Sequence, residues 1–492
     1  MALIEPHVTT AQATITSAIE RETKLSVDRS FRLPELDGER LSRRVLTSTY
    51  YDTSNYDLAH AQITLRRRLE KRKGVWQLKL PMDGARREIE LAGAVGVPPT
   101  VFQELLLLHL HGQALAPVAT LRTWRTGIRV HGRKGASADV LLDTVSVLKD
   151  RHVVRSFREV EIERLSGDGI LVTELGETLR KSGAGDHDGR PKLFRALELP
   201  APHPTEPPPV ESPAVEHLTF ILMKYVEILR LRDPGTRFGG ESEDLHEMRV
   251  STRRLRAILR AARPLLVPGW PDALRTELAW LGELLGPARD LDVQVKYFQE
   301  EAAALESRDR KPLERFVAQL RAERHRVQHS LVTELRSPRY LELVRKLMQA
   351  ARAPAVVVSR VSLFDIAALE FSKLRKAMRE LGGAPTDAGL HRLRIKTKRA
   401  RYAAELAETC TGKPAGRFIA EAKRFQDLLG VHQDAVLAER HIREFTEQST
   451  SVRAAFVAGR MVERQRQRRE SARSTFKAQW KKLKKRGEKA WG

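Results

Sequence analysis

The sequence has little of three features that would otherwise guide its interpretation. Cys410 is the single cysteine, which excludes an internal disulfide framework and a cysteine-based zinc cluster. The most apolar stretch, 101–108, is far shorter than the roughly 20 residues of a membrane helix. The N-terminus lacks the basic and then apolar pattern of a secretory signal. We therefore expect a cytoplasmic protein, with no membrane partner and no redox chemistry.

Aromatic residues are also scarce, at 6% of the chain, whereas positive charge is abundant. The 87 Lys and Arg residues against 63 Asp and Glu give a net charge of +24. Such an excess attracts polyanions, so nucleic acid and polyphosphate are both candidate partners. Stacking platforms for single strands need clustered aromatic rings, so the composition favours phosphate without bases and makes nucleic acid the less favoured partner.

The chain changes character at a proline-rich segment. Seven prolines between Leu199 and Pro213 favour an extended spacer. Before it, short alternating segments have the period of strands, and after it apolar residues recur at helical spacing. We expect a domain at 1–198, a linker at 199–213, a helical domain at 214–480 with repeats at about 214–355 and 356–480, and a basic tail at 481–492.

The helical part contains an internal repeat. The segment His246–Arg256 matches His391–Arg401 at an offset of 145 residues. Further along, Leu284-Leu285-Gly286 with Asp290 matches Leu428-Leu429-Gly430 with Asp434 at an offset of 144. Because order and spacing both repeat, we expect two related bundles of four helices each.

In the first part, charged residues alternate along several expected strands. Glu20, Glu22 and Lys24 are two residues apart and so share one face of a strand. One such strand is an ordinary solvated face. The same parity recurs, however, at Arg66 and Arg68, Lys79, Glu88 and Glu90, and Glu159, Glu161 and Glu163. The pattern predicts a closed barrel whose apolar face packs outward against helices and whose interior is charged.

The ordered set of motifs resembles the CYTH family of triphosphate tunnel metalloenzymes over about the first 195 residues. The set is Glu20-x-Glu22-x-Lys24, Tyr50-Tyr51-Asp52-Thr53, Leu65-Arg66-x-Arg68, Lys79, Arg87-x-x-Glu90, Asp143 and Glu159-x-Glu161. This resemblance implies an α+β protein with an eight-stranded antiparallel tunnel, flanked by helices, which hydrolyses a triphosphate. Two departures are Thr144-Val145-Ser146 where the family often has a glycine, and Pro191-Lys192 where it has Ser-Lys.

The same resemblance assigns roles to residues of this sequence. It implies that Mg²⁺ or Mn²⁺ binds to Glu20, Glu22, Glu88, Glu90, Asp143, Glu159 and Glu161. It implies that the triphosphate binds to Lys24, Arg66, Arg68, Lys79, Lys192 and either Arg122 or Arg125. Glu20, Glu22 and Lys24 are then the catalytic residues. Hard cations prefer carboxylate oxygens and phosphates prefer ammonium and guanidinium groups, so this division makes physical sense.

Each helical repeat also carries a stripe of cations on one helix face. The stripes are His246, Arg249, Arg253, Arg256 and Arg260 in the first repeat, and His391, Arg394, Lys398 and Arg401 in the second. A basic stripe is commonly a solvated face, but like charges stacked twice repel one another unless an anion binds there. The motifs resemble the CHAD family over about 214–480. This resemblance implies two pseudo-symmetric four-helix bundles with a basic cleft that binds polyphosphate.

We therefore expect an inorganic triphosphatase joined to a polyphosphate-binding helical domain, in the cytoplasm and on polyphosphate granules. Three alternatives stay open. The tunnel is catalytically idle and the protein docks on granules, or the tunnel is an adenylate cyclase or a thiamine triphosphatase, or the helical part binds nucleic acid. Metal-dependent release of phosphate from tripolyphosphate would separate the first alternative from the enzyme.

Overall fold

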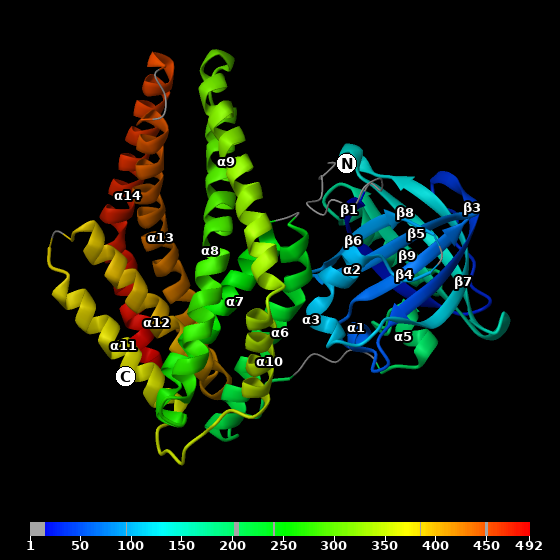
Figure 1. Cartoon of the computed structure of the whole chain (residues 1–492), viewed down its shortest axis with the longest axis horizontal. Helices are drawn as coiled ribbons and strands as arrows, with labels where there is room; N and C mark the ends of the chain where they lie inside the picture. The colour runs from blue at the N-terminus through cyan, green and yellow to red at the C-terminus, as the bar shows by residue number, and fades with distance from the viewer. Residues whose placement is uncertain (1–14, 95, 201–205, 240–241, 384, 448–450) are drawn as a thin grey trace. The chain divides into compact units, whose positions relative to one another are not determined.

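The computed structural model describes residues 15–94, 96–200, 206–239, 242–383, 385–447 and 451–492 (Figure 1). The chain divides into two compact units. The first holds the elements from β1 to α5 and the end of α6, and the second holds the rest of α6 and α7 to α14. The predicted α+β class is confirmed, because an antiparallel sheet is followed by a helical region.

A ten-stranded antiparallel sheet forms the first unit. The strands are β1 (Ile15–Glu20), β2 (Glu22–Val27), β3 (Gly38–Asp52), β4 (Thr64–Glu70), β5 (Lys73–Met82), β6 (Ala85–Ala92), β7 (Ala116–His131), β8 (Ser137–Lys149), β9 (His152–Ser166) and β10 (Gly185–Asp186). Their order is β1-β6-β5-β4-β3-β7-β8-β9-β2-β10. The short helices between them are α1 (Asp57–His60), α2 (Thr100–Leu105), α3 (Leu107–Leu110), α4 (Ile170–Lys181) and α5 (Lys192–Leu197).

This sheet differs from the predicted eight-stranded closed tunnel, because it has ten strands and its hydrogen-bonded order is not closed. The break at Arg21 accounts for part of the difference. It divides the segment that carries Glu20, Glu22 and Lys24 into β1 and β2, and the two-residue strand β10 adds an edge beyond β2. Although Arg21 alone separates β1 from β2, β1 pairs with β6 and β2 pairs with β9. The sheet must therefore curve strongly.

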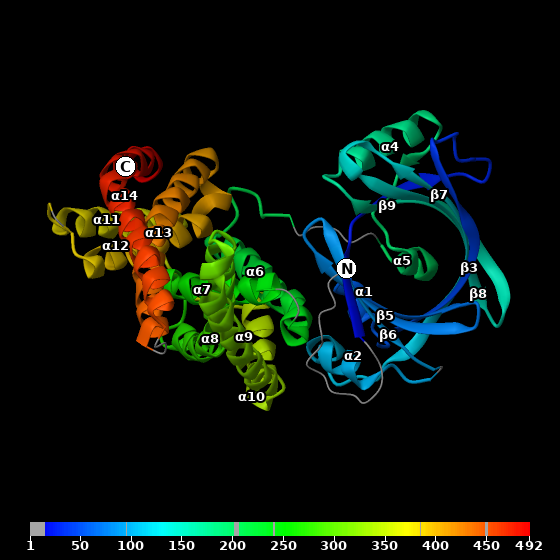
Figure 2. The same ribbon diagram turned by 90° about the horizontal axis from the view of Figure 1, so that it is seen from above.

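The two faces of the curved sheet pack against different helices. Figure 2 shows α4 on the outer side and α5 within the curve. On the outer side, Leu25, Val160 and Ile162 pack with Leu175 and Leu179 of α4, as the alternation of apolar residues predicts. The inner residues Tyr50, Leu121, Val145 and Val147 pack with Leu193, Phe194 and Ala196 of α5. The interior is therefore charged over part of its length, as the pattern predicts, and apolar where α5 fills it.

The second unit is helical, and its two repeats differ in length. Before the loop at 353–362 the helices are α6 (Ala214–Phe238), α7 (Ser242–Ala261), α8 (Trp270–Ala303), α9 (Ser307–Leu335) and α10 (Pro338–Arg352). After it they are α11 (Leu363–Glu380), α12 (Asp387–Thr411), α13 (Lys413–Glu447) and α14 (Val452–Trp491). The first repeat thus has one helix more than the four that were predicted for each. Among the described residues, no helix is both long and apolar enough to span a membrane.

The repeats are not separate bundles, because helices from both build one core. Residues of α8 and α9 pack with residues of α13 and α14. Within this core the ring centroid of Phe316 lies 5.0 Å from that of Phe298 and 4.8 Å from that of Phe445. The shared core fixes the first repeat against the second, so residues on α7 and α12 hold a definite mutual position.

The segment 481–492, which we expected to be a basic tail, lies almost entirely in α14. Leu483 and Trp491 are buried there. The Trp491 ring centroid lies 5.6 Å from that of Phe364 and 5.9 Å from that of Phe418. Apolar residues at a spacing of four therefore dock this last part of the helix, while its lysines remain exposed.

Candidate functional site

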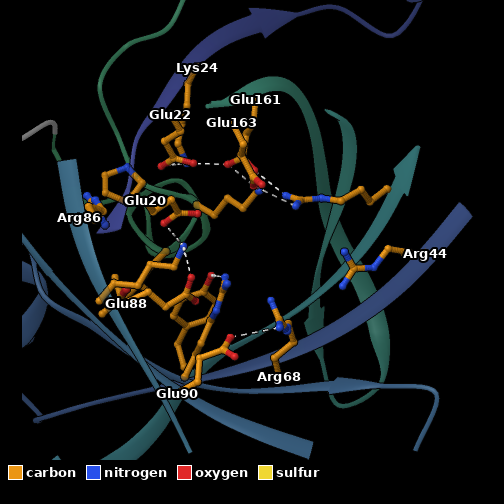
Figure 3. Close-up of a pocket in the computed structure, with 18 residues that line it drawn as sticks. Glu20, Glu22, Lys24, Arg44, Arg68, Arg86, Glu88, Glu90, Glu161 and Glu163 are labelled. Atoms are coloured by element: carbon orange, nitrogen blue, oxygen red, sulfur yellow. Dashed lines mark hydrogen bonds and ion pairs between the residues drawn. The ribbon is translucent and has the colours of Figure 1, made fainter. Parts of the chain in front are cut away.

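The inner face of the sheet encloses a cavity of about 290 Å³ next to α5 (Figure 3). Its lining is almost entirely charged. The lining cations are Lys24, Arg44, Arg66, Arg68, Lys79, Arg86, Arg125 and Lys192, and the lining carboxylates are Glu20, Glu22, Glu88, Glu90, Glu161 and Glu163. Tyr50, Thr64, Pro191 and Leu193 complete the wall. Side chains from eight strands and from α5 thus converge on one space.

Three carboxylates of this wall form a first group, Glu20 of β1, Glu22 of β2 and Glu163 of β9. One oxygen from each lies within 4.8 Å of the other two. Each contacts a different cation, at 2.5 Å from Lys79 to Glu20, 3.2 Å from Lys24 to Glu22 and 3.3 Å from Arg125 to Glu163. Burial, with the neighbouring Glu161, raises the pKa of Glu163 to about 7. Two of these cations are shared with another carboxylate, because Lys24 and Arg125 also contact Glu161.

A second group of carboxylates is buried, with Glu161 in the cavity wall and Asp143 and Glu159 behind it. Its oxygens also converge within 4.8 Å. The Nζ atom of Lys192 lies 2.5 Å from Asp143, 3.0 Å from Glu161 and 3.3 Å from Glu159. Although burial alone would raise it, the adjacent Lys192 holds the pKa of Glu159 at about 2. The three carboxylates are therefore already paired with Lys192 within the protein.

The cations of β4 and β5 are held by neighbours on the same inner face. The Arg66 guanidinium donates to the Tyr50 hydroxyl at 3.0 Å and to the Gln77 amide oxygen at 2.8 Å. Arg68 lies 3.3 Å from Glu90, and Lys79 lies 3.8 Å from Glu88. In Figure 3 this cluster lies across the cavity from Glu22, Glu161 and Glu163. The cavity therefore presents a carboxylate side and a mixed, cation-bearing side.

Most of the residues that the sequence assigned to the tunnel come together here, with some differences. Glu20, Glu22, Lys24, Arg66, Arg68, Lys79, Glu88, Glu90, Arg125, Glu161 and Lys192 line the cavity. Asp143 and Glu159 lie behind the wall, in the second group. Glu88 and Glu90 belong to neither group. Arg122 is exposed on the other face of β7, because residues three apart on a strand point to opposite faces. Of the two arginines named as alternatives, Arg125 is therefore the one that lines the cavity.

The sequence interpretation missed several residues of the wall. Thr64 and Arg86 have the same strand parity as the residues that were chosen, so alternation alone could have identified them. Glu163 was placed on this face by its parity but had no assigned role. Tyr50 belonged to a recognised motif but had no assigned role. Arg44 has the same strand parity as Tyr50 on β3, with no register shift between them, so alternation could have identified it too.

In the second unit, the two cationic stripes lie on α7 and α12. Arg253 of α7 donates to the hydroxyl of Tyr402 on α12 at 3.1 Å. Its charge acts on both Arg394 and Lys398. Burial, and then repulsion from Arg394, Arg253 and Arg401, lowers the pKa of Lys398 to about 7. The facing stripes thus carry positive charge that the fold leaves partly uncompensated.

Not every stripe residue is free for a ligand. Arg249 contacts Asp290 at 2.9 Å, and Arg260 contacts Glu370 at 3.2 Å. Arg401 is 6% exposed and lies 3.5 Å from Glu405, so it serves packing, contrary to the expectation of an exposed cation. Arg253, Arg256 and His391 are exposed, whereas His246, Arg394 and Lys398 are half-buried. The ligand-facing part of the stripes is therefore shorter than predicted.

The glycines of the repeated Leu-Leu-Gly segments lie next to two of these arginines. A Cβ atom at Gly286 would lie 3.7 Å from the Arg249 guanidinium, and one at Gly430 would lie 3.3 Å from that of Arg394. Each glycine leaves room for the arginine of its own repeat. Asp290 and Asp434, which follow the two glycines, interact with the same two arginines. The internal repeat of the sequence thus corresponds to two equivalent surroundings, one around Arg249 and one around Arg394.

Two domain-family models match the chain. The model described as CYTH domain matches residues 18–189, and the model described as CHAD domain matches residues 221–443. An uncharacterized protein of Mycobacterium tuberculosis, Rv2226, is 29% identical over 512 residues, which cover 96% of this chain and 98% of that protein.

Solved structures match part of the chain at low similarity. A structure described as PptA from Streptomyces chartreusis is 20% identical with a TM-score of 0.44, and covers 54% of this chain and 96% of that one. The CHAD domain from the plant Ricinus communis is 25% identical with a TM-score of 0.46, and covers 56% of this chain and 96% of that one.

Proposed function

The chain carries a CYTH domain followed by a CHAD domain, and we propose that it hydrolyses inorganic triphosphate with a divalent metal ion and binds polyphosphate through its helical unit. CYTH domains include triphosphatases and cyclases, and CHAD domains are associated with polyphosphate. In this proposal the curved sheet is the wall of a triphosphate tunnel, whose ends meet at Arg21 between β1 and β2. Polyphosphate granules in the cytoplasm would supply the ligand of the helical unit.

The observation that carries the proposal is the composition of the cavity wall. Eight cations and six carboxylates line about 290 Å³. A triphosphate has room there, and its charge complements the cations. The carboxylates would repel such an anion unless a metal ion bridged the two. The cations of the wall would therefore balance the charge of the phosphate chain, and a metal ion would balance that of the carboxylates.

The wall also favours a ligand without a base or other ring. Tyr50 is its one aromatic residue among those described, and the Tyr50 hydroxyl already accepts a bond from Arg66. A nucleotide base or a thiazole ring needs an apolar or aromatic surface. We therefore place adenylate cyclase and thiamine triphosphatase behind inorganic triphosphatase.

The first carboxylate group fits a hard divalent ion. Glu20, Glu22 and Glu163 converge and line the cavity, and burial together with the neighbouring Glu161 raises the pKa of Glu163 to about 7. Mg²⁺ and Mn²⁺ prefer such carboxylate oxygens. When bound, the ion would neutralise developing charge on the phosphate oxygens and activate a water molecule.

The remaining work falls to the residues of the chain. Arg66, Arg68, Lys79 and Arg86 bind the phosphate chain and hold it straight for in-line displacement. Tyr50 and Gln77 hold Arg66 in place, so its guanidinium needs little reorganisation. Helix α5 closes one side of the cavity and excludes water from the apolar inner surface.

The test is phosphate release from tripolyphosphate, ATP, thiamine triphosphate and long polyphosphate with Mg²⁺ or Mn²⁺, with cyclic AMP assayed in parallel. We expect tripolyphosphate to react fastest. Glu22→Gln should lower this rate by about 10²-fold or more, since metal-linked charge stabilisation contributes several kcal/mol. Glu177→Gln, at an exposed carboxylate on α4, is the matched control and should leave the rate unchanged. A Glu22→Gln variant as fast as wild type would refute the metal site.

Two further outcomes separate the alternatives. Polyphosphate binding without turnover of any triphosphate would favour a granule-docking protein with an idle tunnel. When DNA and polyphosphate compete for the helical unit at equal phosphate concentration, we expect polyphosphate to stay bound. Displacement of polyphosphate by DNA would instead favour nucleic-acid binding.

A further inference from the structure

Lys192 occupies the centre of the second carboxylate group. Its Nζ atom lies within 3.3 Å of oxygens from Asp143, Glu159 and Glu161, and its side chain is 10% exposed. These three carboxylates have the spacing that would suit a metal ion. An ammonium group therefore stands where a second cation of the tunnel would otherwise bind.

The fold fixes the ammonium group in this position. Lys192 is the first residue of α5, whose Leu193, Phe194 and Ala196 are buried. These apolar side chains pack against the inner residues Tyr50, Leu121, Val145 and Val147. Withdrawal of Lys192 from the carboxylates would strain or unseat the helix. The lysine is thus placed by packing as well as by charge.

Other cations complete the coordination of the same carboxylates. The Arg125 guanidinium donates to both oxygens of Asp143, at 2.8 and 2.7 Å. Arg195 contacts Glu159 at 3.0 Å, and Lys24 contacts Glu161 at 2.7 Å. A divalent ion needs oxygen ligands at about 2.0–2.6 Å and would have to displace these buried contacts. The second group therefore does not fit a metal ion.

The first group differs in this respect. No single cation in the contacts of Glu20, Glu22 and Glu163 serves more than one of them. Their side chains line the cavity and are reachable by solvent, with 16% of Glu20 and 25% of Glu163 exposed. The two groups thus have the same ligand type and spacing, but only in the second does one cation, Lys192, contact all three carboxylates.

We propose that Lys192 is the resident cation of the Asp143, Glu159 and Glu161 group, so that the tunnel binds one divalent ion, at Glu20, Glu22 and Glu163. The inference rests on the metal site of the proposed function. It makes the three buried carboxylates positioning residues for Lys192 instead of metal ligands. It also gives the cavity one positive charge that does not depend on the concentration of metal.

The test counts bound Mn²⁺ on the full-length chain by electron paramagnetic resonance and calorimetry, with each variant compared to wild type. Asp143→Asn should bind as many Mn²⁺ ions as wild type, whereas Glu22→Gln should bind one fewer. Lys192→Met should bind one more, and this ion should be lost again in Lys192→Met with Asp143→Asn. Lys192→Arg keeps the charge and is the matched control, with an unchanged count. Circular dichroism and the melting temperature check that each variant is folded.

The proposal is overturned if Asp143→Asn loses one Mn²⁺ in the wild-type background, because the buried group would then hold a metal beside Lys192. It is also overturned if folded Lys192→Met gains no ion. A Glu22→Gln variant that keeps every Mn²⁺ is a different result, since it refutes the metal site of the proposed function itself. The count needs no turnover, so an idle tunnel can be tested in the same way.

Discussion

The tunnel cavity and the stripes on α7 and α12 are both rich in cations, yet they balance this charge differently. In the tunnel, cations and carboxylates come from neighbouring strands and touch one another, as Arg125 does with Asp143, Glu161 and Glu163. On the helices, Arg253 faces Arg394 and Lys398, and repulsion lowers the pKa of Lys398. Cations and carboxylates of the cavity thus offset one another in large part, whereas several cations of the stripes face one another. The same substitution should therefore have different consequences in the two regions.

The largest expected effect is on the stability of the tunnel. Arg125→Met should lower the local free energy of unfolding by about 3–5 kcal/mol, because it leaves buried carboxylates without their partner. Hydrogen exchange of the β7 to β9 amides measures this. Arg129→Met, which removes a more exposed pair with Asp139 on the same strand, should cost at most about 1 kcal/mol. Equal costs would contradict the contrast between buried and exposed pairs.

The corresponding change on the helices should weaken binding and spare stability. Arg253→Met combined with Arg394→Met should lower polyphosphate affinity by about 100-fold and reduce the slope against salt by about two phosphate contacts. Titration at several salt concentrations checks this. Arg321→Met with Arg326→Met removes the same charge from exposed positions on α9. If this control lost as much affinity, net charge and not the stripes would govern binding.

Metal binding in the tunnel should strengthen as the pH rises. Burial and Glu161 raise the pKa of Glu163 to about 7, so below pH 7 a proton competes with the ion. Mn²⁺ affinity should then increase up to roughly tenfold between pH 6 and 8 and level off above this. Calorimetry in buffers of different ionisation enthalpy measures the proton released. Glu163→Gln should remove the dependence, and a wild-type affinity that falls with pH would contradict the assignment.

Polyphosphate binding should have the opposite pH dependence. Burial and the neighbouring arginines lower the pKa of Lys398 to about 7, and a bound polyanion favours its charged form. Affinity should therefore rise up to roughly tenfold from pH 8 to 6, with uptake of a proton. Lys398→Arg stays charged throughout and should give a flat profile over this range. An unchanged profile in that variant would assign the proton to another group.

The smallest effect compares the two repeats through their glycines. Alanine in a helix is favoured over glycine by about 0.5–1 kcal/mol. Gly286→Ala should gain this stability, because its Cβ meets Arg249 at an ordinary 3.7 Å. At Gly430 the contact is 3.3 Å, so Arg394 must shift and the gain should be smaller, with weaker polyphosphate binding. Thermal unfolding and titration measure both, and identical behaviour would mean that Arg394 moves freely.

Strand alternation explains how much of the tunnel was predictable. Parity placed Glu20, Glu22, Lys24, Arg66 and Lys79 on one face, because side chains along a strand alternate between only two faces. Parity could not tell which carboxylates pair with cations of the protein itself, because Lys192 contacts Asp143 although the two are 49 residues apart in the sequence. Contacts between distant segments, and not local pattern, decide these roles.

Helical periodicity was less decisive in the second unit. It placed the stripes on α7 and α12 and paired them by the repeat. It also assigned Arg401 to polyphosphate binding, although Glu405 lies one helical turn later and pairs with it. The number of helices before the loop at 353–362 and the shared core depend on long-range packing, which a repeat in sequence does not reveal.

The break at Arg21 has a consequence for how the protein is made. Because β2 pairs with β9, Lys24 meets Glu161 only after 137 further residues have been synthesised. Closing so long a loop is slow and entropically costly, so we expect β2 to pair later than β1, whose partner β6 is much nearer in the sequence. The carboxylates proposed to hold the metal lie on both sides of this late pairing. We therefore expect the proposed metal site to be completed only when β2 joins β9.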